Sequence, residues 1–163
     1  MLLALGGAAS LTLRRTLRAA KPRAPLLVLS SDEYAIFTAV AERVVAVDED
    51  APSVGDVDVA GRADAAMALW PAAVQREFRQ LLRLFESALT GVVTLTGLAP
   101  FTGSDALTQD ARLLAWSRSR VAVFRTGYQA MKRLACACYY AAPESWPVTG
   151  YPGPPELPFT EPE

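Results

Sequence analysis

Histidine is absent from this chain of 163 residues, and cysteine occurs only twice, as Cys136 and Cys138. Without histidine, neither a Ser-His nor a Cys-His catalytic pair can form. Two thiols with no histidine and no further cysteine make a poor zinc site. On one helix the two cysteines would lie ~200° apart around the axis, so they would not easily bridge each other. The sequence therefore implies no disulfide framework.

Other sequence signatures of catalysis and cofactor binding are also missing. No G-x-G-x-x-G follows a strand, and there is no phosphate-binding P-loop. Tyr139 and Tyr140 are interpreted as packing residues rather than acid-base groups. An acidic segment lacks the spacing of a calcium loop and is interpreted as solvated; its carboxylates are Asp48, Glu49, Asp50, Asp56 and Asp58. We expect no catalytic residue, metal or cofactor in this chain.

Charge is nearly balanced overall but unevenly distributed. The formal net charge of -1 argues against a general nucleic-acid binder. Residues 1–25 hold five basic residues and no acid, and residues 112–133 hold six basic residues and no acid. The last 21 residues hold four glutamates and no base. These blocks are either solvated faces or surfaces that dock against opposite charge.

No apolar run is long enough to cross a membrane, so we expect no transmembrane segment. Residues 1–13 are apolar but shorter than the ~20 residues that a spanning helix needs. Arg14 and Arg15 resemble a twin-arginine export signal, which requires an apolar stretch after the arginines. Lys21, Pro22 and Arg23 interrupt that stretch. We interpret residues 1–25 as a retained basic arm or degenerate signal, which favours a cytoplasmic location, with periplasmic export as the alternative.

Strand-like alternation is absent beyond a few residues, whereas helical periodicity is common. The composition is 52% hydrophobic, which indicates a large core or an apolar surface for a partner. The sequence therefore predicts an all-α fold: one compact helical bundle over residues 26–142. A C-terminal tail rich in proline, glycine and aromatic residues, expected to be extended, follows over residues 143–163.

Local signals place the helices of this bundle. Ser30 and Glu33 have capping-box spacing, which predicts a helix that ends near Val47. A loop over 48–58 and a helix over 59–70 follow. Pro71 is expected in the first turn of a helix that Gly91 terminates. A loop over 92–107, a helix from a Thr108 cap through Trp116, and a helix over 119–141 complete the bundle.

Two apolar stripes are expected to face the core. The stripe before Gly91 consists of Val74, Phe78, Leu81, Leu82, Phe85 and Leu89. The stripe of the last helix consists of Val121, Phe124, Tyr128, Met131, Ala135 and Cys138, which places Cys136 on the polar side. Pro143 is expected to end this helix.

The segment WPVTGYPGPP, residues 146–155, is the least usual part of the sequence. It places Trp146 and Tyr151 among four prolines and two glycines. Large rings gain nothing from exposure to water, so they are expected to cover something. The tail is either an aromatic anchor for a partner or a plug in the chain's own core.

The order of residues through the last helix and the tail resembles the gluconate 2-dehydrogenase subunit 3 family. The resemblance covers roughly residues 26–155 and is strongest in the tail. It rests on Ser31-Asp32-Glu33-Tyr34, Trp116, Ser117, Ser119, Tyr128, Leu134, Tyr139, Tyr140, Pro143, Trp146, Gly150, Tyr151, Gly153 and Pro154.

This resemblance implies a non-catalytic accessory subunit. Such subunits accompany a flavin-dependent catalytic subunit of the glucose-methanol-choline oxidoreductase type and carry no cofactor, so FAD is expected only in the partner. The alternative is a free-standing helical protein that binds a small apolar ligand in its bundle. The expected partner interface comprises Tyr139, Tyr140, Trp146, Gly150, Tyr151, Pro152, Gly153 and Pro154.

Overall fold

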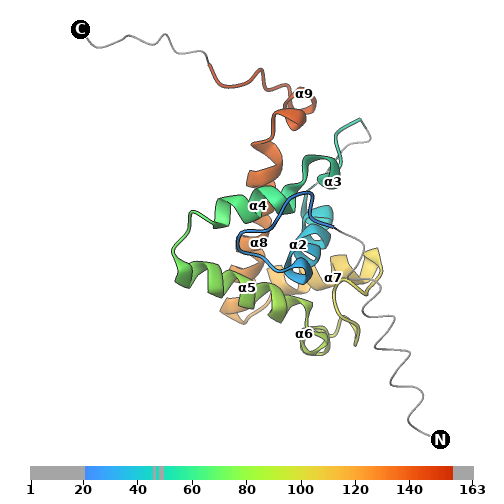
Figure 1. Ribbon diagram of the computed structural model, residues 1–163. Helices are drawn as coiled ribbons and strands as arrows, with labels where there is room; N and C mark the ends of the chain where they lie inside the picture. The colour runs from blue at the N-terminus through green and yellow to red at the C-terminus, as the bar shows by residue number, and fades with distance from the viewer. Residues whose placement is uncertain (1–20, 46, 48–49, 156–163) are drawn as a thin grey trace, which may run out of the picture.

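The computed structural model describes residues 21–45, 47 and 50–155, and this part of the chain folds into helices without any strand. The predicted all-α bundle is therefore confirmed. The helices are α2 (Ser31–Val44), α3 (Val54–Val57), α4 (Val59–Met67), α5 (Ala72–Glu86), α6 (Ala88–Val93), α7 (Ala106–Ser117), α8 (Ala122–Tyr140), the 3₁₀ turn η1 (Pro143–Ser145) and α9 (Trp146–Thr149) (Figure 1).

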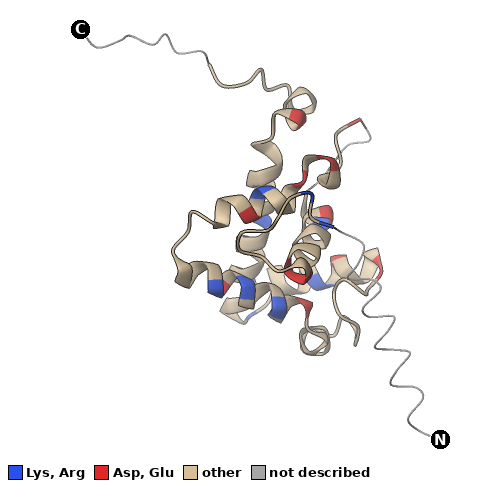
Figure 2. Ribbon diagram, in the orientation of Figure 1, with Lys and Arg blue, Asp and Glu red and all other residues tan. Residues whose placement is uncertain are grey.

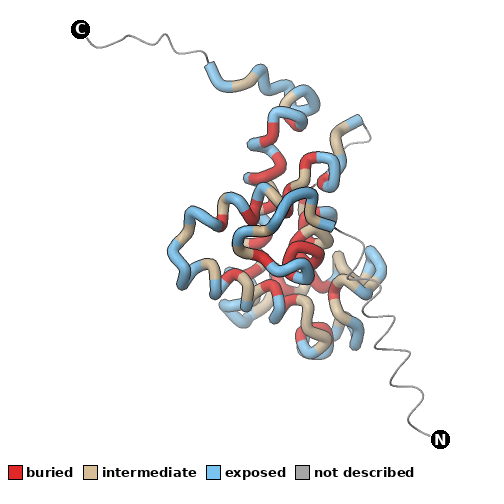
Figure 3. The backbone as a smooth tube through the Cα atoms, in the orientation of Figure 1, coloured by how far each residue is buried: buried red, intermediate tan, exposed pale blue. Residues whose placement is uncertain are grey.

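Helix α2 forms the centre of the bundle and packs against α4, α5, α7 and α8. Its Phe37, Val40 and Ala41 are fully buried. The long helix α8 also packs on α4 and α7. Buried residues gather where these helices meet, whereas the C-terminal tail is mainly exposed (Figure 3).

The start of α2 has the predicted capping box. The Ser30 hydroxyl accepts from the Glu33 N–H at 3.3 Å, and the Glu33 carboxylate accepts from the Ser30 N–H at 2.8 Å. Glu33 also forms ion pairs with Arg79 and Arg83 of α5, both at 2.8 Å. The carboxylate that caps the start of α2 therefore also links α2 to α5.

One buried carboxylate holds the segment that leads into α2. Asp64 of α4 accepts the backbone N–H groups of Leu27, Val28 and Leu29, at 2.6, 2.9 and 2.7 Å. These amides belong to no helix or strand, and Asp64 supplies the acceptor that secondary structure would otherwise provide. Residues 27–29 are therefore held on α4 just before α2 begins.

Several predicted boundaries are corrected. The loop over 48–58 contains the short helix α3, whose Ser53 and Asp56 form a second capping box. Asp105 rather than Thr108 caps α7 and accepts the Thr108 N–H at 2.8 Å. Pro71 is the N-cap residue of α5 rather than part of its first turn. The tail begins with η1 and α9, so its first residues are helical rather than extended.

The end of α5 is also corrected. Gly91 does not terminate this helix, because α5 ends at Glu86, and Gly91 lies buried inside α6. Ser87 has a ψ of 134°, which turns the chain away from the α5 axis. Leu89 therefore leaves the predicted stripe and is 75% exposed. Val74 is 42% exposed, so its predicted burial is also wrong, whereas Phe78, Leu82 and Phe85 are buried as predicted.

The α8 stripe is confirmed over its C-terminal half. Met131, Ala135 and Cys138 are buried, and Cys136 lies at the edge of the core. Val121 precedes α8 as its N-cap residue and is half exposed, so its predicted burial is wrong. Burial raises the pKa of the Cys138 thiol to about 11, which keeps it protonated at neutral pH.

Some predictions concern residues that the structure does not describe. Arg14, Arg15 and most of the basic arm lie outside the described residues, as do positions 156–163 of the tail. Within the described part, no helix combines the length and apolar character needed to cross a bilayer.

Candidate partner interface

The tail is fixed to the end of α8 by its first residues. The buried Ser145 hydroxyl donates to the carbonyls of Tyr139 at 2.9 Å and Ala142 at 2.8 Å. Glu144 forms an ion pair with Arg62 of α4 at 3.1 Å. The direction in which the tail leaves the bundle is thus set by buried hydrogen bonds together with one half-exposed ion pair.

Trp146 and Tyr151 pack against each other. Their ring centroids lie 5.3 Å apart in an edge-on arrangement, and the Trp146 indole N–H donates to the Tyr140 carbonyl at 3.2 Å. Edge-on aromatic pairs of this kind contribute about 0.5–1.5 kcal/mol beyond the area they bury. The two rings therefore form a preformed pair on the protein surface, which we call the aromatic clasp.

Two glycines allow the chain to fold around the clasp. Gly150 ends α9 with a φ of 69°, and Gly153 has a φ of 102°, both in the region that favours glycine. A side chain at Gly153 would also lie 3.1 Å from the Trp146 ring. The Tyr151 N–H donates to the Trp146 carbonyl at 3.1 Å and closes the turn.

The tail contributes a mainly apolar surface around the clasp and supplies no basic residue of its own. Tyr140, Val148 and Tyr151 are each 40–47% exposed. Pro147, Pro152 and Pro154 are exposed around them. No Lys or Arg follows Arg133 in the sequence, and Figure 2 shows no blue on this end of the ribbon.

The clasp does not plug the bundle. Trp146 is only half-buried, Tyr151 is 47% exposed, and neither belongs to the buried core cluster. The structure therefore excludes the core-plug alternative for these two rings. In Figure 1, α9 lies beyond the end of α8, away from α5 and α6.

Tyr139 differs from the other expected interface residues because it lies in the core. It is 1% exposed, and its hydroxyl donates to the Pro52 carbonyl at 2.7 Å. Its ring meets that of the half-exposed Tyr140 at a centroid distance of 5.1 Å. Tyr139 is therefore a core residue beneath this surface, and Tyr140 is the tyrosine of the pair that reaches solvent.

Residues that support the clasp were missed by the sequence analysis. Ser145 follows Pro143 and Glu144 in a short turn, which is a weak local signal for an anchored segment. Arg62 gave no signal at all, because its partner Glu144 lies 82 positions away.

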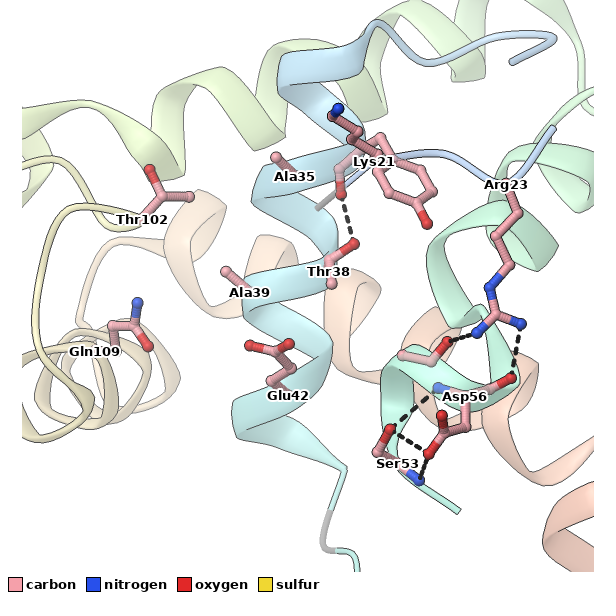
Figure 4. A pocket seen from close by; sticks show the side chains of 12 residues that line it. Lys21, Arg23, Ala35, Thr38, Ala39, Glu42, Ser53, Asp56, Thr102 and Gln109 are labelled. Atoms are coloured by element: carbon pink, nitrogen blue, oxygen red, sulfur yellow. Dashed lines mark hydrogen bonds between the residues drawn. The ribbon is translucent and has the colours of Figure 1, made fainter. Parts of the chain in front are cut away.

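A polar hollow of about 490 Å³ lies between α2, α3 and the start of α7 (Figure 4). Arg23 on its rim donates to the carbonyls of Gly55 at 2.7 Å and Asp56 at 3.1 Å, so its guanidinium is committed to holding α3. Asp56 is committed to the Ser53 capping box, and hydrogen bonding from Ser53 lowers the pKa of Asp56. Arg23, Ser53 and Asp56 in this lining are thus engaged in holding α3.

A smaller apolar groove of about 290 Å³ lies between α5 and α8. Its lining is Val74, Glu77, Phe78, Leu81, Val123, Thr126, Gly127 and Ala130. Leu81 packs directly onto Gly127, where an added methyl would clash with it. Among the described residues, no group of three or more His, Cys, Asp or Glu side chains is placed to hold a metal ion.

Comparison with known proteins gives no family assignment. The chain matches no model of a known protein family, no curated protein and no solved structure.

Proposed function

We propose that this chain is a non-catalytic accessory subunit that binds and stabilises a flavin-dependent oxidoreductase through its C-terminal aromatic clasp. The observation that carries the proposal is the exposed, preorganised pair of Trp146 and Tyr151. Tryptophan and tyrosine dominate the binding energy of protein interfaces. A pair that is already ordered loses less conformational entropy on binding.

The identity of the partner rests on the resemblance of the tail to the gluconate 2-dehydrogenase subunit 3 family. It implies a catalytic subunit of the glucose-methanol-choline type that carries the FAD. The absence of histidine supports the non-catalytic part of this proposal, because the commonest general base is missing. An adjacent open reading frame with a dinucleotide-binding glycine fingerprint would identify the partner to test.

Co-expression with that flavoprotein, followed by affinity purification, tests the proposal. We expect a stable complex that Trp146→Ala weakens by about 2 kcal/mol or more, as truncation of an aromatic hot spot does. Leu69→Ala is the matched control, because Leu69 is 88% exposed and lies outside the tail. Unchanged binding by the Trp146→Ala, Tyr151→Ala double variant would refute the anchor. A stable monomer that ignores the flavoprotein would refute the accessory role.

The second candidate is a free-standing protein that binds a small apolar ligand. The groove between α5 and α8 favours it, because its lining is almost entirely apolar. A fluorescent fatty acid titrated into the purified chain tests this function. Val123→Glu, at an exposed position in the groove, should abolish binding if the groove is the ligand site. Saturable binding that Val123→Glu abolishes, together with no flavoprotein complex, would favour the second candidate.

A further inference from the structure

Helix α6 presents its apolar face to solvent. Leu89, Val92 and Val93 have the i, i+3, i+4 spacing of one helix face, and they are 75%, 46% and 68% exposed. Thr90 and Gly91 lie on the inner face and are buried. A surface helix of a globular domain normally has the opposite arrangement, with aliphatic residues inward.

The turn after α6 extends this apolar surface. Leu95 is 93% exposed and Leu98 is 80% exposed. Leu95 also has a φ of 56°, which is unfavourable for residues other than glycine. We call residues 88–98, with the five exposed side chains of Leu89, Val92, Val93, Leu95 and Leu98, the apolar tip.

The apolar tip carries no charge. Residues 87–104 contain no Asp, Glu, Lys or Arg, and Figure 2 shows α6 without charged positions. Isolated exposed aliphatic residues are ordinary, but a concentration within eleven residues marks an interaction site.

The threonine hydroxyls of the tip are bonded within the chain. The Thr90 hydroxyl donates to the Ser87 carbonyl at 2.7 Å, and the Thr94 hydroxyl donates to the Thr90 carbonyl at 2.6 Å. The Thr96 hydroxyl pairs with that of Thr94 at 2.9 Å. The Leu95 and Thr96 N–H groups donate to the carbonyls of Val92 and Gly91. The tip therefore shows aliphatic side chains outward while its hydroxyls are engaged inward.

A buried guanidinium supports the tip from below. Arg112 of α7 is fully buried, and it donates to the Ala99 carbonyl at 2.8 Å and the Thr96 hydroxyl at 3.3 Å. Gly91 lies directly against this guanidinium, since an added methyl there would be 2.5 Å from Arg112 Nη2. The outward arrangement of the leucines is thus built into the packing of the fold.

These features distinguish a bilayer from a protein partner. Protein interfaces centre on Trp, Tyr and Arg, with leucine and valine under-represented, and form about one hydrogen bond per 100–200 Å². Hydrocarbon offers no hydrogen-bond partner, so it favours a surface whose exposed side chains are aliphatic and whose hydroxyls already have partners within the chain. Apolar side chains on a membrane-surface segment insert at the boundary between headgroups and acyl chains.

We propose that the apolar tip inserts shallowly into the surface of a lipid bilayer and attaches this protein peripherally to a membrane. The proposal goes beyond the accessory role and does not depend on it. In Figure 1, α6 and α9, the helix that begins with Trp146, lie at opposite ends of the described bundle, so a membrane and a partner can be bound together.

Flotation of the full chain with phosphatidylcholine vesicles tests the proposal. The Leu95→Glu, Leu98→Glu variant should bind at least tenfold more weakly than wild type, because both charges enter the bilayer boundary. The matched control is Leu69→Glu, Val121→Glu, which adds the same charge at exposed leucine and valine positions outside both the tip and the groove between α5 and α8. Circular dichroism checks that both variants are folded. Because residues 1–13 are also apolar, the comparison between these variants decides the outcome.

A second measurement locates the insertion. Brominated phosphatidylcholine should quench the tryptophan fluorescence of a Leu95→Trp variant more strongly than that of wild type. For a Leu69→Trp variant, the added tryptophan should not be quenched. Equal vesicle binding by the tip and control variants would overturn the proposal.

Conversion of a dimer to a monomer by the tip variant without lipid would instead assign the tip to self-association. Loss of the flavoprotein complex in the tip variant, without vesicle binding by wild type, would assign it to a protein interface.

Discussion

Glu33 and Glu86 line the same hollow between α2, α5 and α6, yet their pKa values are shifted in opposite directions. Burial raises the pKa of Glu33, but the Ser30 N–H, Arg79 and Arg83 outweigh it, so the net pKa lies below the usual value. Burial also raises the pKa of Glu86, and its hydrogen bonds from Thr102 do not reverse the shift. Partners rather than burial alone therefore decide which carboxylate is stabilised in its charged form.

The lowered pKa of Glu33 predicts a loss of stability in acid. A carboxyl whose folded pKa lies below its unfolded value stabilises the fold above that unfolded value, near 4.5, and loses this contribution as pH falls. Glu33→Gln should lower the free energy of unfolding by about 1–3 kcal/mol at pH 7 and flatten its decline in acid. Urea denaturation at several pH values measures this, with the exposed Asp32→Asn as control. If the free energy of unfolding of Glu33→Gln fell in acid as steeply as that of wild type, the lowered pKa of Glu33 would be contradicted.

The raised pKa of Glu86 predicts the opposite slope. The pKa of Glu86 is higher in the folded than in the unfolded protein. The stabilisation that Glu86 gives to the fold is therefore fully present below the unfolded pKa and is lost as pH rises through the folded pKa. Glu86→Gln should remove this decline and leave the protein at least as stable as wild type at pH 7. The Thr102 N–H, 3.1 Å from Glu86, still finds a carbonyl acceptor in glutamine. Urea denaturation at several pH values measures this pH dependence, with the exposed Glu77→Gln as control. If Glu86→Gln were less stable than wild type at pH 7, the prediction would be wrong.

At the scale of elements, short-range signals were readable and long-range packing was not. The Ser30–Glu33 capping box and the buried side of α5 follow from spacings of three or four residues, so the sequence predicted them. The bend at Ser87 could not be predicted from local spacing. It places α6 so that Gly91 packs on Arg112 of a separate helix, which is a contact between distant parts of the sequence. The same holds for the candidate site: its aromatic residues were recognisable, but the burial of Tyr139 depends on Pro52, 87 positions away.

Gly91 in α6 should tolerate no side chain. A methyl group there would lie 2.5 Å from Arg112 Nη2 and would also press on the Gly97 carbonyl. Gly91→Ala should therefore lower the free energy of unfolding by about 1–3 kcal/mol, as overpacking does. Gly55→Ala in α3 is the matched control, since its nearest neighbour is 3.7 Å away and its φ is ordinary. Urea denaturation measures the free energy of unfolding of both variants. If the two variants were equally stable, Arg112 would have to move aside to accept the added methyl group.

At the scale of the whole molecule, the described residues form a bundle with the aromatic clasp at one end and the apolar tip at the other. The overall class of the fold followed from helical periodicity and from the absence of alternation. The exposed ends are harder to recognise, because an aliphatic run such as residues 88–98 resembles core sequence. Only the buried positions of Thr90 and Gly91 reveal that its leucines point outward.

Truncation should separate the bundle from its tail. A chain that ends after Ser145 keeps the buried Tyr139, Ala142 and Ser145, so its melting temperature should stay within about 5 °C of wild type. A chain that ends after Cys138 loses all three and should be destabilised by about 3 kcal/mol or more. Differential scanning calorimetry distinguishes the two. If the longer truncated chain melted like the shorter one, the clasp would be part of the folding unit.

The three hydrogen bonds to Asp64 have a consequence for hydrogen exchange. The amides of Leu27, Val28 and Leu29 should exchange slowly with solvent deuterium although they belong to no helix or sheet. Since one carboxylate holds all three, they should become exchangeable in a single opening event and report one common protection factor. The rate of that event would measure how often residues 27–29 detach from α4 while the helices remain folded.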